Sequence, residues 1–240
     1  MMRDAKNLWK TLNLLDDWLS AGFRRPHPDV IVDETPVPSN AASLTAAVAT
    51  SSDAGARAAE LQEIAKQVAA CTKCGLSVNR TVTVPGEGPL DAAVMFVGEG
   101  PGAEEDRTGR PFVGAAGQYL DTWLPPIGLA RDQCFIANCV KCRPPQNREP
   151  HPDEITACLT YLQRQVALVR PRIICCLGRI AAHTLLGTTR SLGELRGKTH
   201  SFQGIPVIVT YHPSAVLRDK ATLRKPVWDD LKRLQGMLAQ

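Results

Sequence analysis

The sequence contains 240 residues, of which 44% are hydrophobic and 22% are charged, and its formal net charge at pH 7 is +4. These proportions are typical of a globular protein with one sizeable core. No apolar run approaches the roughly 20 residues that span a bilayer, and no secretion signal is recognisable, so we expect a cytoplasmic protein without membrane contact.

The charge is distributed unevenly along the chain. Residues 1–60 contain six Lys or Arg and eight Asp or Glu, whereas the remainder contains 22 basic and 16 acidic residues. A basic body is compatible with a polyanionic partner such as nucleic acid. A solvated basic surface without such a partner would give the same composition.

The first 57 residues differ in composition from the rest. Leu8, Leu12, Leu15 and Leu19 recur at helical spacing, which predicts an amphipathic helix within residues 1–23. Such a helix more often packs on its own domain, and binding to an unidentified partner is the alternative. Residues 24–57 are rich in Pro, Ser, Thr and Ala, which predicts a disordered linker. The main domain is therefore expected over residues 58–240.

Strand and helix patterns alternate through the main domain. Short apolar runs predict strands over residues 92–97, 134–140, 172–177 and 205–211, and helical patterns cover 58–70, 115–124, 153–170, 179–186 and 225–238. This alternation predicts an α/β fold with three αβα layers around a central, mainly parallel, four-stranded sheet.

A Gly-rich segment, Val97–Gly117, follows the first predicted strand. Loops at the carboxyl ends of parallel strands are where open α/β sheets bind ligands. The segment is therefore the leading candidate for an active-site loop. A phosphate-binding loop of an unrelated nucleotide enzyme is one interpretation, but the acidic run Glu104-Glu105-Asp106 is unfavourable for bound phosphate.

Four of the eight cysteines suit a metal centre. Cys71 and Cys74 form a C-x2-C pair at the end of a predicted helix, Cys142 lies in a loop, and Cys158 lies near the start of the next helix. Four thiolates suit either tetrahedral zinc or an iron–sulfur cubane, so spacing leaves both open. The other four lie in predicted strands, where a free Cys usually packs as a small apolar residue.

Two polar residues are expected at the same sheet edge as the Gly-rich segment. Asn138 lies near the end of the second predicted strand, and His212 follows the fourth. Each alone suits an ordinary turn or backbone contact. Their convergence with the loop predicts a site.

Four motifs carry a resemblance to a known family. GEGPGAEED at 98–106, GRPFVGAAG at 109–117, NCVKCRPP at 138–145 and YHPSAVLR at 211–218 resemble the family 4 uracil-DNA glycosylases. The resemblance covers about residues 60–235, in the right order. It implies a DNA repair enzyme that releases uracil and leaves an abasic site. It also implies a [4Fe–4S] cluster, held here by the four cysteines named above.

The resemblance assigns roles to the sheet-edge residues. Phe112 is expected to stack on the flipped base, Asn138 to read uracil through its carboxamide, and His212 to donate a hydrogen bond to uracil O2. Glu99 is expected to orient water or contact the sugar, and the neighbouring Gly100 provides no side chain for a direct base.

The resemblance also implies contacts that select the base and grip the DNA. Glu105 is expected to exclude the thymine methyl group, with Tyr119 as the alternative. Ser214 is expected to contact a DNA phosphate, and Leu217 and Arg218 to lie at the minor-groove wedge.

The partners implied are uracil-containing DNA, single- or double-stranded, with the protein as a nucleoid-associated monomer of prokaryotic type. The alternative function is a non-catalytic nucleic-acid-binding module with a structural metal site.

Overall fold

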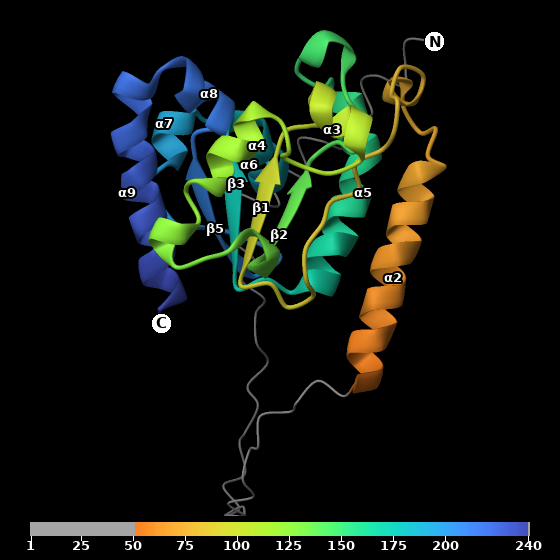
Figure 1. Ribbon diagram of the computed structural model, residues 1–240, viewed down its shortest axis with the longest axis horizontal. Coiled ribbons are helices and arrows are strands. Elements are labelled where there is room, and N and C mark those ends of the chain that lie inside the picture. The colour runs from red at the N-terminus through yellow and green to blue at the C-terminus, as the bar shows by residue number, and fades with distance from the viewer. Residues whose placement is uncertain (1–50, 240) are drawn as a thin grey trace, which may run out of the picture. The chain divides into compact units, whose positions relative to one another are not determined.

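The structure is a computed structural model and describes residues 51–239. The predicted N-terminal helix and residues 24–50 of the predicted linker lie outside these residues. Within the described part, the chain forms one sheet with helices on both faces (Figure 1). The predicted fold class, three αβα layers around a mainly parallel sheet, is confirmed.

The sheet has five strands in the order β2-β1-β3-β5-β4. The four strands predicted from the sequence pair in parallel, and β4 runs antiparallel to β5 at the edge. The bounds are β1 Val94–Gly98, β2 Cys134–Asn138, β3 Ile173–Leu177, β4 His200–Phe202 and β5 Ile205–Thr210. Every residue of β1, β2 and β3 is buried, as expected for parallel strands covered on both faces.

Two apolar clusters fix the helices to the sheet. On one face, Met95 and Ile174 pack with residues of α5, α6 and α7, and on the other, Phe96 and Ile208 pack with residues of α4, α8 and α9. A third cluster joins α2 to α5. The helices are α2 Ser51–Ala69, α3 Ala103–Thr108, α4 Ala115–Asp121, α5 Pro152–Val169, α6 Arg179–Leu186, α7 Leu192–Leu195, α8 Pro213–Arg218 and α9 Lys220–Leu238, with 3-10 turns at Gly75–Ser77, Pro125–Ile127, Arg131–Gln133 and Pro145–Asn147.

Four features of the fold differ from the sequence predictions. The expected four-stranded sheet has a fifth strand, β4, which was missed because it is three residues long and only partly buried. Residues 51–57, assigned to the linker, form the start of α2, where Arg57 donates to Asp91 Oδ1 across 2.8 Å and to the Leu168 carbonyl across 2.9 Å. The Gly-rich segment contains the short helix α3. The last helix begins at Lys220 and continues through Pro226.

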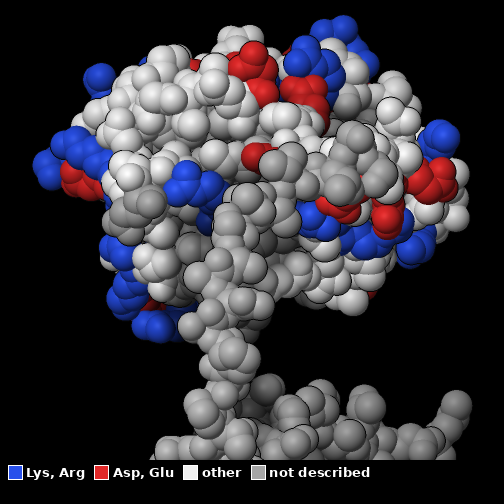
Figure 2. All heavy atoms as spheres, turned by 90° about the horizontal axis from the view of Figure 1, so that it is seen from below, with Lys and Arg blue, Asp and Glu red and all other residues white. Residues whose placement is uncertain are grey.

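No helix in the described part of the chain is long and apolar enough to cross a membrane. Figure 2 views the molecule from below, opposite to the carboxyl ends of the parallel strands in Figure 1. In Figure 2, Lys and Arg form separate groups on this face, and several of these groups lie beside Asp or Glu. On the visible part of this face the basic residues form no continuous stripe.

Candidate active site

The predicted site residues meet at the carboxyl ends of the parallel strands. Glu99 follows β1, Asn138 ends β2, and His212 follows β5. They line one cleft of about 480 Å³ together with parts of α3, α4 and α8. Five other residues named from the sequence also line it, of which the last two belong to α8: Gly100, Glu105, Phe112, Ser214 and Arg218.

Asn138 provides a buried amide at the floor of the cleft. Its side chain is 1% exposed, and its Oδ1 atom has no hydrogen-bond partner within the described residues. A buried carbonyl oxygen without a partner costs about 1–3 kcal/mol, so a site that leaves one is suited to a ligand that donates to it. Gly98 lies opposite Asn138 in the strand pairing, and a Cβ atom at Gly98 would collide with Oδ1.

Phe112 lies in a backbone conformation that an aromatic residue rarely adopts. Its φ is +51°, in the left-handed region, where non-glycine residues are strained. Its ring centroid lies 5.6 Å from that of His212, with the two planes tilted by 36°. The ring is 5% exposed and also packs against Gly98, where a Cβ would overlap it. An aromatic face therefore lies beside the buried amide in a strained conformation that the surrounding contacts must maintain.

Arg131 holds the segment that carries Phe112. Its Nη1 donates to the Phe112 carbonyl across 3.0 Å, and its Nη2 donates to the Pro111 carbonyl across 2.5 Å. The same guanidinium is paired with Asp121 at 2.8 Å and Glu87 at 3.0 Å. Sequence reasoning missed this residue because it lies 19 positions from Phe112, in the Arg131–Gln133 turn that precedes β2.

Glu105 holds two parts of the Gly-rich segment together through hydrogen bonds to its backbone. Oε1 accepts from the backbone N–H groups of Val113 and Gly114 across 2.8 Å each, and Oε2 accepts from Gly102 N across 3.0 Å. The carboxylate is 8% exposed and fixed by three donors. It lines the cleft and anchors the backbone of the segment, a role that the sequence did not indicate.

His212 is the N-cap of α8, and its tautomer follows from its contacts. Ser214 N donates to Nδ1 across 3.2 Å, and Nδ1 lies 2.8 Å from Ser214 Oγ. A ring nitrogen that accepts from a backbone N–H carries no proton, so the neutral ring carries its proton on Nε2. Burial, with a further contribution from Arg218, lowers the pKa of His212 to about 4. At neutral pH the ring is therefore an uncharged Nε2–H donor.

Glu99 also lines the cleft and is half-buried. Burial and the nearby Glu149 raise the pKa of Glu99 to about 7, although Arg179 opposes the shift. The carboxyl group is thus close to half-ionised at neutral pH and can accept a proton. The adjacent Gly100 allows close packing, because a Cβ there would lie 2.8 Å from Val140 Cγ2.

Two residues named from the sequence do not line the cleft. Leu217 is half-buried on α8, one position before the exposed Arg218. Tyr119, the alternative residue for excluding thymine, lines a separate groove beside α9. The side chain of Tyr119 therefore lies outside the cleft, which favours Glu105 over Tyr119 for the proposed exclusion of thymine.

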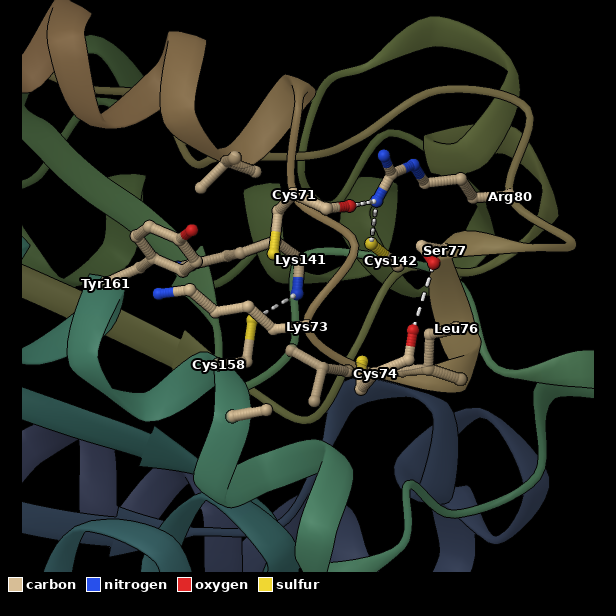
Figure 3. A pocket seen from close by; sticks show the side chains of 13 residues that line it. Cys71, Lys73, Cys74, Leu76, Ser77, Arg80, Lys141, Cys142, Cys158 and Tyr161 are labelled. Carbon is tan, nitrogen blue, oxygen red and sulfur yellow. Dashed lines mark hydrogen bonds between the residues drawn. The ribbon is translucent and has the colours of Figure 1, made fainter.

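The four predicted cysteine ligands line a second, smaller hollow between α2, the Gly75–Ser77 turn and α5 (Figure 3). Cys142 and Cys158 are 7% and 8% exposed, and Cys71 and Cys74 are partly exposed. Among residues 51–239, no three His, Cys, Asp or Glu side chains converge closely enough to hold one metal ion. The other four cysteines are buried in or beside strands, as predicted.

Two donors in the hollow point at cysteine sulfurs. Arg80 Nη1 donates to Cys142 Sγ across 3.1 Å and to the Cys71 carbonyl across 2.8 Å, and Lys141 N donates to Cys158 Sγ across 3.3 Å. Figure 3 shows both bonds from opposite sides of the hollow. Hydrogen bonds to the sulfurs are a usual means of stabilising thiolate ligands. Sequence reasoning did not identify Arg80 or Lys141.

Comparisons with known proteins agree with this geometry. The family model described as the uracil DNA glycosylase superfamily matches residues 85–232. The chain belongs to this superfamily. It is 46% identical over 186 residues to the type-4 uracil-DNA glycosylase of Sulfurisphaera tokodaii, which covers 74% of this chain and 84% of the relative. The type-4 uracil-DNA glycosylase of Thermotoga maritima is 44% identical, covering 75% of this chain and 95% of the relative.

These relatives confirm the family 4 resemblance drawn from the four motifs. In this glycosylase the cleft and the cysteine hollow are built from neighbouring parts of the sequence, because only three residues separate Asn138 from Cys142. Lys141 joins them, since its Nζ donates to the Asn138 carbonyl across 2.9 Å. Nothing in the sequence indicates that Lys141 is buried, because Lys is normally an exposed residue.

Proposed function

We propose that this glycosylase hydrolyses the bond between C1′ of deoxyribose and N1 of uracil in DNA. Uracil excision is the activity of the family to which the chain belongs, and the chain is accordingly a monofunctional hydrolase of DNA repair. The C1′–N1 bond breaks with its electron pair passing to uracil, and water adds to C1′. The products are free uracil and an abasic site.

The base must leave the duplex to reach the cleft, at a cost of a few kcal/mol. Phe112 offers an aromatic face for the extruded ring, worth about 1–3 kcal/mol per stacked base. Asn138 Oδ1 accepts from uracil N3–H, and its amide N–H donates to O4. Cytosine presents the reverse pattern at both atoms and would leave the buried amide unpaired.

His212 stabilises the leaving group. Negative charge develops on uracil O2 as the bond breaks, and the Nε2–H of His212 donates to it. Because Ser214 fixes Nδ1 as an acceptor, the ring needs no rearrangement during the reaction. One such preorganised donor contributes roughly 10²–10³ in rate.

Glu99 orients the attacking water on the sugar side of the cleft. Its raised pKa, about 7, allows the carboxylate to accept a proton from that water. Gly100 keeps the neighbouring position free of a competing side chain.

Glu105 excludes thymine. Its carboxylate is held by three backbone donors and cannot turn aside for a methyl group at C5. Ser214, Leu217 and Arg218 on α8 contact the DNA beside the flipped nucleotide, with Ser214 and Arg218 near phosphates and Leu217 filling the vacated space.

Cys71, Cys74, Cys142 and Cys158 fit a [4Fe–4S] cluster, because four thiols from three segments surround one hollow that also contains two donors to sulfur. A bound cluster would supply a structural cross-link between α2, the loop after β2 and α5. The excision chemistry itself needs only the cleft residues.

We further propose that the protein acts as a monomer on DNA in the cytoplasm, in the nucleoid, because one chain supplies the whole cleft. An N-terminal helix within residues 1–23 remains a proposed contact for an unidentified partner.

The proposal rests on Asn138 Oδ1, which has no hydrogen-bond partner within residues 51–239 and shares the cleft with His212, whose tautomer is fixed by Ser214. The test is release of free uracil from an oligonucleotide, followed by alkaline cleavage at the abasic site. Asn138→Ala and His212→Ala should each lower the rate at least about 100-fold while DNA binding persists. Full activity in both variants would refute the site, and absence of excision by the unmodified chain would favour a non-catalytic DNA-binding module.

A further inference from the structure

A second groove lies beside the cleft and is used by none of the steps above. Its volume is about 750 Å³, and it runs between α4, the Pro125–Ile127 turn, α8 and α9. Its lining contains three aromatic and three basic residues and no acidic residue: Tyr119, Trp123, Trp228, Lys220, Arg224 and Lys225. We name it the α4–α9 groove.

The groove neighbours the cleft, because α4 and α8 supply lining residues to both. Ala115 and Ala116 of α4 line the cleft, and Tyr119 lies about one helical turn further on, in the groove. On the other wall, Arg218 lines the cleft and Lys220 lines the groove. In Figure 1, α4 and α8 lie together at the carboxyl end of the sheet, and α9 descends from them along the side.

Two basic residues and one aromatic residue lie along one stripe of α9. Lys220, Arg224 and Trp228 are spaced four residues apart, so they lie on one face of the helix. Lys220 Nζ lies 5.8 Å from the Tyr119 ring centroid and links this stripe to α4. Trp228 is 36% exposed, an unusual state for a large apolar side chain.

This chemistry fits one kind of occupant. Cationic side chains neutralise phosphates, and exposed aromatic rings stack on bases, but only on bases that are not paired. We propose that the α4–α9 groove binds an unpaired stretch of the substrate strand next to the flipped nucleotide. This rests on the DNA substrate of the proposed function, and it predicts that the protein engages single-stranded DNA over more nucleotides than the cleft holds.

The experiment measures uracil excision from two single strands, one with a single nucleotide on each side of uracil and one of about 16 nucleotides. The unmodified full chain should show a lower KM for the long strand. Trp228→Ala and Arg224→Ala should each raise that KM at least about fivefold, with kcat and the short strand unaffected. Trp228→Phe and Arg224→Lys should restore it, because stacking or charge is retained.

Salt dependence separates the two kinds of contact. Arg224→Ala should reduce the slope of log affinity against log salt by about 0.7, the value for one phosphate of a single strand. Trp228→Ala should leave the slope unchanged. Lys66→Ala removes an exposed cation from α2, far along the chain from the groove, and serves as the charge control.

The outcomes distinguish this proposal from the proposed function. If neither strand were cleaved by the unmodified chain, the function itself would fail. If both strands were cleaved and the groove variants matched Lys66→Ala, the groove would have no role in strand binding. Unchanged kinetics with faster proteolysis of residues 1–50 in the groove variants would assign the groove to the N-terminal segment and overturn the proposal.

Discussion

Arg131→Ala tests how the stacking ring is held in place. The substitution removes two hydrogen bonds to the carbonyls of Pro111 and Phe112, together with the ion pairs to Glu87 and Asp121. A hydrogen bond from a charged group contributes about 1.5–3 kcal/mol, and the left-handed conformation of Phe112 costs about 1–3 kcal/mol. Two lost bonds outweigh the strain, so the segment should relax and carry the ring away.

We expect Arg131→Ala to lose base stacking on Phe112, although the variant retains every side chain proposed to take part in the reaction. Stacking is worth about 1–3 kcal/mol, so kcat/KM for uracil-containing DNA should fall about tenfold. Phe112→Ala should give a similar fall. The double variant should be no worse than Phe112→Ala alone, because Arg131 acts through the ring. Steady-state kinetics on the four proteins measures this coupling.

Arg110 provides the matched control. It also pairs with Glu87, at 2.9 Å, but its side chain is 60% exposed and makes no bond to the Pro111 or Phe112 carbonyls. Arg110→Ala should leave kcat/KM within about twofold. Additive losses in the Arg131→Ala, Phe112→Ala double variant would refute the reasoning, and so would an equal loss in Arg110→Ala.

Two further predictions concern protonation and the cysteine hollow. The rate should rise with pH up to about 7 as Glu99 loses its proton, and Glu99→Gln should abolish this rise in a pH profile of kcat while lowering the plateau. If the profile is unchanged in that variant, Glu99 does not activate water. Cys142→Ala should lose visible iron–sulfur absorption and melt at a lower temperature, whereas the buried strand variant Cys175→Ala should keep the absorption. Retained absorption in Cys142→Ala would remove it from the ligand set.

The sequence allowed prediction of the parts of the fold that follow from local pattern. Parallel strands such as Ile173–Leu177 are continuous apolar runs, and turns after them carry Gly, Asn or His, so the sheet edge and its cleft could be assembled in advance. The strand β4 could not, because three half-exposed residues at an edge have no distinctive periodicity. Its pairing depends on β5 as a neighbour.

The residues that hold the site were harder to predict than those that face the ligand. Phe112 and His212 belong to motifs, but Arg131 and Arg80 act across 19 and 62 positions in sequence. Neither Arg lies in a recognisable sequence motif. The sequence alone does not distinguish an Arg that is solvated at the surface from one that anchors a backbone segment. Glu105 was named from its motif, but only the structure shows that its carboxylate accepts from three backbone groups.

Lys141 gives the sharpest test of whether the cleft and the cysteine hollow depend on each other. It is 1% exposed, and its Nζ donates to the Asn138 carbonyl and to Gln165 Oε1 across 2.7 Å. Lys141→Met keeps the volume but leaves both acceptors unpaired, at a cost of about 1–3 kcal/mol each. We expect a lower melting temperature and a rise in the KM for uracil-containing DNA, because the turn that carries Asn138 loses its support.

Lys73 is the comparison that makes this result interpretable. It also lines the cysteine hollow, but it is exposed and its Nζ lies over the Tyr161 ring at 4.8 Å. Lys73→Met removes the same charge from the hollow without touching Asn138, so it should leave KM unchanged. If both variants raised KM equally, the charge near the cysteines would be responsible. If only Lys141→Met raised KM, then Lys141, whose backbone N–H also donates to Cys158 Sγ, would be the residue that supports the proposed uracil-reading amide of Asn138.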